Sequence, residues 1–109
     1  VSAADPLVVR AGIAAICEPR LLADPVTAEA ALAACGRATS HLRDTAPGRR
    51  RHPDVRTLRQ ALGYCWSVAV AGSPRTGLVA FAALPTGDPD IAWVARENRR
   101  KQRLARLIG

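Results

Sequence analysis

The stretch Asp5-Pro6-Leu7-Val8-Val9-Arg10 decides the fold of this chain, because close copies of it recur as His52-Pro53-Asp54-Val55-Arg56 and Asp88-Pro89-Asp90-Ile91-Ala92. Each copy places a capping residue before proline and then opens an amphipathic helix on a β-branched residue. The branched residues of successive copies are 46 and 36 residues apart. Self-similarity at a period of roughly 40–47 residues is typical of solenoids built from paired helices. The sequence therefore predicts the architecture far better than the function.

Two further pairs of a capping residue and proline, Asp24-Pro25 and Ser73-Pro74, mark helix starts between these copies. Within residues 25–44 and 53–71, apolar side chains recur at intervals of three and four residues, so each segment has one continuous apolar helical face. We expect helices over residues 6–17, 25–44, 53–71, 74–84 and 89–107, with a short turn over 20–23 between the first two.

The composition of the 109-residue chain supports an all-α domain. Hydrophobic residues make up 49%, but only four residues are aromatic, so alanine, leucine and valine supply most of the apolar surface. Alanine favours helices and lets them approach closely. The longest apolar runs, around 61–72 and 77–84, are too short to cross a bilayer, so we expect no membrane partner. The chain lacks methionine and opens on an unpaired helix, from which we expect the C-terminal part of a longer polypeptide.

Cys17, Cys35 and Cys65 are odd in number and lie too far apart in sequence for a zinc knuckle or a redox pair. Each lies among alanine, leucine or tryptophan in an expected helix. We interpret them as buried, reduced thiols of a cytoplasmic protein, and expect neither a metal site nor a cofactor.

With the three copies aligned, the chain resembles HEAT-repeat proteins of bacterial origin. The resemblance implies a right-handed α-solenoid of antiparallel helix pairs, with two complete pairs and an unpaired leading helix. It also implies that Asp5 and Asp54 cap helices and that Arg10 and Arg56 contribute to a ladder between repeats. The third copy departs from the pattern, because Ala92 stands where the arginine is expected. In such stacks the second helix of each pair, here 6–17, 53–71 and 89–107, lines the concave surface that binds partners.

The net charge is +7, and residues 96–106 carry six basic side chains and one acidic side chain. On a continuous helix, positions 96, 99, 100 and 103 share one face. This face could follow a phosphate backbone or an acidic protein, or it could be the solvated polar cap of the last repeat. The expected partner-binding residues are Arg10, Arg56, Arg59, Arg96, Arg99, Arg100, Lys101 and Arg103.

We therefore expect a non-enzymatic scaffold or protein–protein interaction module with a basic surface, whose partner is an acidic protein. The alternative is a nucleic-acid-binding HEAT-like protein. In a relative of the DNA alkylation-repair proteins, Trp66, Trp93 and Asp90 would surround a nucleotide. Trp66, however, continues an apolar helix face, which favours a core position. His41 is expected to be exposed, and neither it nor His52 has a nearby nucleophile, so no catalytic residue is assigned. The sequence leaves the oligomeric state open.

Three structural expectations remain. The loop 45–52, with Arg49, Arg50 and Arg51, is expected to be exposed. Glycines inside helices, at positions 12, 36 and 63, indicate either close helix packing or a groove. The last helix is expected to dock through its first two turns on 53–71 and 74–84 and to project into solvent through its middle, including Asn98. Its terminal residues Leu104, Leu107 and Ile108 then either fold back or dock another chain.

Overall fold

The computed structural model describes residues 5–108, and this part of the chain folds entirely into helices and connecting turns. The helices are α1 (Pro6–Ile16), α2 (Pro25–Asp44), α3 (Pro53–Gly72), α4 (Pro74–Ala82), α5 (Pro89–Arg99) and α6 (Gln102–Ile108), with short 3-10 turns η2 (Leu21–Ala23) and η3 (Pro47–Arg49). All five expected helix starts and the turn before α2 are confirmed. The all-α class is confirmed with them. The expected final helix is wrong, because it is divided into α5 and α6.

Side chains of the preceding residues cap most of these helices. Asp5 accepts a hydrogen bond from the N–H of Leu7, and Asp24 accepts one from Thr27. The capping role that the resemblance implied for Asp54 is wrong. The Nδ1 atom of His52 instead accepts a hydrogen bond from the Asp54 N–H at 3.2 Å, which leaves the Asp54 carboxylate in the first turn beside the positive helix end.

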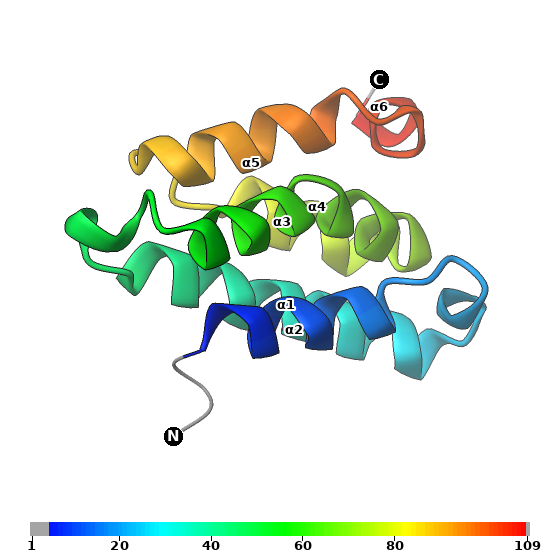
Figure 1. Ribbon diagram of the computed structural model, residues 1–109. Helices are drawn as coiled ribbons and strands as arrows, with labels where there is room; N and C mark the ends of the chain where they lie inside the picture. The colour runs from blue at the N-terminus through cyan, green and yellow to red at the C-terminus, as the bar shows by residue number, and fades with distance from the viewer. Residues whose placement is uncertain (1–4, 109) are drawn as a thin grey trace.

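Helix α3 lies at the centre of the molecule and contacts α1, α2, α4, α5 and α6. Figure 1 shows α1 and α2 on one side of α3 and α5 on the other, so that the helices are stacked in tiers. The described chain measures 36 × 27 × 18 Å along its principal axes. This arrangement makes α3 a common floor for any surface shared between α1 and α5.

The core follows the apolar stripe of α3. Trp66 is 1% exposed, and its indole N–H donates a hydrogen bond to the Thr39 hydroxyl at 2.9 Å, as a buried tryptophan requires. Its ring meets that of Phe81 edge-on at 6.2 Å. The core position expected for Trp66 is confirmed.

The three cysteines are buried and free, as expected. The sulfur atoms of Cys17 and Cys35 lie 3.7 Å apart. The hydrogen bond to Cys17 and burial raise the pKa of Cys35 well above its usual range. Both causes favour the protonated thiol at Cys35.

The structure corrects the account of the C-terminal segment. Helix α5 docks on α3 as expected, but its second neighbour is α2 rather than the expected segment 74–84. Asn98 is fully buried rather than projecting into solvent. The chain turns at Arg100 and Lys101, and α6 then packs back on α3 through Leu104, which is also fully buried. Leu107 and Ile108 stay exposed. Asn98 can be buried because its amide finds hydrogen-bond partners inside the protein, which the polar character of the residue did not predict.

The helical glycines fall into two classes. A Cβ atom on Gly63 would lie 3.0 Å from the Trp93 ring, so this glycine permits close packing of α5 on α3. A Cβ atom on Gly12 or Gly36 would meet nothing within 4 Å among the described residues. Close packing therefore accounts for Gly63 alone of these three.

Within residues 5–108, no helix has both the length and the apolar character that crossing a membrane would require.

Candidate functional site: a cationic groove across α1, α3 and α5

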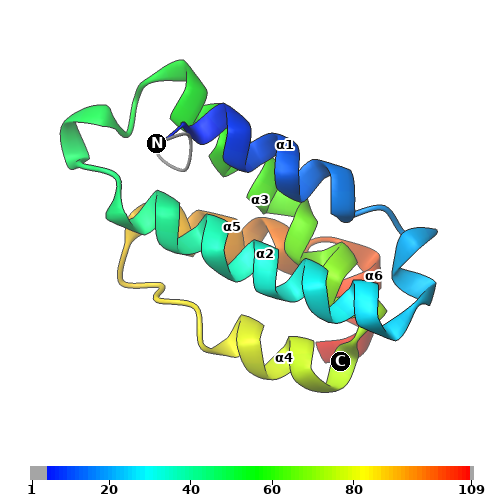
Figure 2. The ribbon, with the colours of Figure 1, turned by 90° about the horizontal axis from the view of Figure 1, so that it is seen from below.

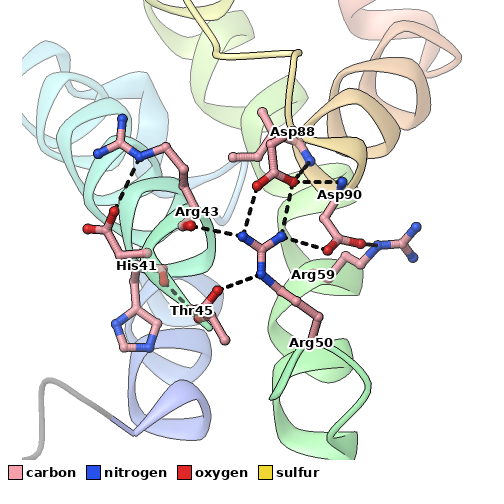
Figure 3. Close-up of polar contacts among 9 residues, drawn as sticks. His41, Arg43, Thr45, Arg50, Arg59, Asp88 and Asp90 are labelled. Carbon is pink, nitrogen blue, oxygen red and sulfur yellow. Dashed lines mark hydrogen bonds and ion pairs between the residues drawn. The ribbon is translucent and has the colours of Figure 1, made fainter. Parts of the chain in front are cut away.

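A partly buried ion-pair network centred on Arg50 joins the end of α2 to the start of α5 (Figure 3). The Arg50 guanidinium donates two hydrogen bonds to the Asp88 carboxylate, at 3.0 and 2.8 Å, and one to Asp90 at 2.8 Å. Its remaining donors reach the backbone oxygens of Arg43 and Thr45, both at 2.8 Å. All five guanidinium donors are thus used.

The expectation that Arg50 is an exposed loop residue is wrong, because its side chain is only 17% exposed. The loop turns through η3, which directs the guanidinium inward to the carboxylates at the N-terminus of α5. Hydrogen bonds from Arg50 hold the pKa of Asp88 below its ordinary value. Asp88 also caps α5, since it accepts hydrogen bonds from the N–H groups of Asp90 and Ile91.

A second part of this network positions Trp93. The Arg59 Nε donates to Asp90 at 2.9 Å, and the Arg59 guanidinium carbon lies 3.8 Å from the centre of the Trp93 ring. The cation therefore stacks on the indole while its charge is paired. The Trp93 ring also packs against α3 at Gly63, because the missing side chain of this glycine leaves room for the ring. Trp93 is fixed between these two contacts.

Trp93 forms one wall of a groove of about 440 Å³ that crosses α1, α3 and α5. We call it the cationic groove. Arg10 enters it from α1, Gln60 and Tyr64 come from α3, and Lys101 follows the end of α5. The residues span 92 positions of sequence, from 10 to 101. They meet because α1 and α5 both pack on α3.

The groove combines free cations with an accessible aromatic surface. Within residues 5–108, neither Arg10 nor Lys101 forms an ion pair. The acidic residue of the groove, Glu97, is already bound to Arg100 at 3.1 Å. Tyr64 is 41% exposed, and partial burial raises the pKa of its phenol, which therefore remains a hydrogen-bond donor at neutral pH. This set of groups suits a ligand with carboxylates and some apolar surface.

The expected partner-binding residues do not all gather at this groove. Arg10 and Lys101 line it, and Arg56 is exposed on α3 one turn before Gln60. Arg59 does not line the groove; it pairs with Asp90 and stacks on the Trp93 ring.

The expectation that the C-terminal arginines share one face is wrong, because the helix is broken. Arg96 is exposed on α5, and Arg100 pairs with Glu97. Arg99 lies over the Phe81 ring at 5.4 Å. Arg103 lines a separate hollow with Leu22 and Gly72. The basic run is therefore distributed around the end of the molecule.

Sequence reasoning missed Arg50, Gln60 and Tyr64. The signal for the latter two was present, since Arg56, Gln60 and Tyr64 recur every four residues on the side of α3 opposite its apolar stripe. Arg50 gave no local signal, because its partners lie 38 and 40 residues away.

The histidines add no chemistry to this site. His41 is half-buried rather than exposed as expected, and His52 serves as the cap of α3. Among residues 5–108, no three histidine, cysteine, aspartate or glutamate side chains are grouped so that they could hold a metal ion.

Comparisons with known protein families, with curated proteins and with solved structures found no match, so the HEAT-repeat resemblance depends on the repeated helix entries alone.

Proposed function

We propose that this protein is a non-enzymatic scaffold of the HEAT-repeat type whose cationic groove binds an acidic segment of a protein partner. The observation that carries the proposal is the convergence of Arg10 and Lys101, neither of them ion-paired within the described chain, on one groove with an exposed tyrosine. Arg10 is exposed and Lys101 is half-buried, and cations that are free of ion pairs attract a carboxylate-rich partner. Tyr64 and Trp93 supply the aromatic contact area that is enriched in protein interfaces.

The architecture supports the scaffold part of the proposal. Helices α1, α3 and α5, the expected second members of the pairs, contribute to one continuous surface. A right-handed HEAT solenoid presents its binding residues in this way, on the second helix of each pair. The free, buried cysteines fit a cytoplasmic location, where thiols stay reduced, and this location is part of the same proposal.

The rival proposal is nucleic-acid binding. The overall charge of +7 favours it, but the C-terminal cations that would follow a phosphate backbone point to different parts of the surface. A nucleic-acid interface needs several phosphate contacts along one track, because each contact contributes separately to affinity. An acidic segment of a protein needs only the two free cations and the aromatic floor of the groove.

The test compares two labelled polyanions, an oligoglutamate peptide and a DNA duplex, by fluorescence anisotropy over a series of salt concentrations. We expect the peptide to bind near physiological salt and the duplex not to bind. Duplex binding that falls steeply with salt, without peptide binding, would favour the rival. If neither probe binds at low salt, the proposed ligand class is wrong.

A further inference from the structure

Helix α1 is apolar around nearly its whole circumference. Arg10 is its one charged residue, and the helix buries Ile13 inward. Its outer surface carries Leu7 and Val8, which are 42% and 51% exposed, followed by alanine and glycine residues that are also exposed. A helix that is hydrophobic on every side is ordinarily covered on every side. Among the described residues α1 is covered on one side only.

The uncovered side of α1 forms an apolar groove with α2 of about 1070 Å³, which we call the α1–α2 groove. Figure 2 looks onto this side, and no other helix lies in front of α1 or α2. Gly12 and Gly36 both line this groove, and neither is required by packing within the chain. Each weakens its helix relative to alanine. Their position instead leaves room for a helix that approaches from outside.

The charge of this groove differs from that of the remaining surface. Its charged lining residues are Arg37 and Asp44, which sum to zero, whereas the whole chain carries +7. They lie seven residues apart on α2, or about two helical turns. Asp44 also contacts Arg43 at 3.3 Å, in a pair that is exposed on both sides. An acidic partner gains nothing from a neutral surface, whereas two copies of a basic chain can approach here with least repulsion.

We propose that the α1–α2 groove is a homodimer interface, in which the α2 helices of two copies pack antiparallel across a two-fold axis and α1 of each copy flanks them. A two-fold axis makes every contact occur twice, so Arg37 of each copy faces Asp44 of its partner. This register centres the antiparallel crossing near Ser40, which also lines the groove. Val8 then provides a large, exposed apolar side chain that the small residues of the partner groove accept. The proposal is independent of the cationic groove.

The test is sedimentation velocity over a concentration series for the full chain. The wild-type protein should form dimers, and Val8→Glu should shift the equilibrium strongly toward monomer. The matched controls are Val26→Glu and Val79→Glu, because these valines are 77% and 72% exposed but do not line the groove. Both controls should dimerise like the wild type, and circular dichroism should show the same helix content in all variants.

A charge exchange tests the register and does not depend on the apolar substitution. Arg37→Glu alone and Asp44→Arg alone should each weaken the dimer by placing like charges opposite one another. The double variant Arg37→Glu/Asp44→Arg should recover dimerisation, since the pair is restored in reverse. A wild-type protein that stays monomeric at all concentrations would overturn the proposal. So would a dimer that Val8→Glu and Val26→Glu weaken equally, or a double variant weaker than both single ones.

Discussion

The side-chain oxygen of Asn98 accepts a hydrogen bond from the backbone N–H of Ser67 at 2.8 Å, which fastens α5 to the middle of α3. The Asn98 amide nitrogen donates to the backbone oxygens of Leu62 and Val94, at 2.8 and 2.7 Å. A buried amide that uses both ends in this way acts as a specific clasp, because an apolar replacement removes all three hydrogen bonds. The clasp places Lys101, three residues later, at the cationic groove.

Replacing Asn98 by leucine should therefore destabilise the protein although it adds apolar volume to a buried site. We expect the free energy of unfolding to fall by about 3 kcal/mol, because the partners in α3 lose their hydrogen bonds. Urea denaturation followed by circular dichroism measures this change. The control is Gln102→Leu, at an exposed position of α6, which should change stability by less than about 0.5 kcal/mol. Equal effects of the two substitutions would contradict the clasp.

Stability should depend on pH through Asp88. Arg50 and the backbone N–H groups of α5 hold the pKa of Asp88 lower in the folded protein than in the unfolded chain. The ionised carboxylate therefore stabilises the folded state at pH values above its unfolded pKa, which is about 3.9. This contribution is lost as the pH falls below that value and through the folded pKa.

Urea titrations from neutral to acid pH check this dependence. In Asp88→Asn the protein should be less stable at neutral pH, and its stability should fall less steeply on acidification. Glu18→Gln is the control, because Glu18 is exposed and forms no ion pair within residues 5–108. A pH profile that Asp88→Asn leaves unchanged would show that the Arg50 network does not stabilise the fold.

Two glycines offer a matched comparison of helix packing. Gly63→Ala should lower the free energy of unfolding by about 1 kcal/mol, because the added Cβ lies 3.0 Å from the Trp93 ring and displaces it. Gly36→Ala should raise it by up to about 1 kcal/mol, since alanine favours the helix and nothing lies within 4 Å. Thermal unfolding of dilute protein compares both. Changes of the same sign at the two positions would contradict this account of the groove wall.

Helix starts could be predicted from the sequence because their signals are local. Asp5, Asp24 and Asp88 cap helices within three residues of their own positions, and proline follows each of them directly. The break after α5 could not be predicted in this way. Nor could the burial of Asn98, whose partners Ser67 and Leu62 lie more than 30 residues earlier in the chain.

The candidate site was predictable only in part for the same reason. Arg10 and Lys101 were identified as cations, but their meeting requires the stacking of α1 and α5 on α3. In sequence, Arg50 and Arg59 cannot be told from the exposed arginines near them. Only the structure shows that they are partly buried and paired with Asp88 and Asp90. Charge in a sequence therefore indicates how many cations there are, while the fold determines which of them remain free.

The central claim is that the cationic groove, rather than the net charge, binds an acidic partner. The most direct measurement compares two double variants of equal charge, Arg10→Ala/Lys101→Ala and Arg20→Ala/Arg75→Ala, in binding to a labelled oligoglutamate peptide. Arg20 and Arg75 are exposed and lie outside the groove. We predict that the groove variant loses about tenfold or more in affinity, which corresponds to ~1.4 kcal/mol, while the control stays within about twofold of the wild type. Equal losses in both variants would contradict the claim, because affinity would then follow net charge alone.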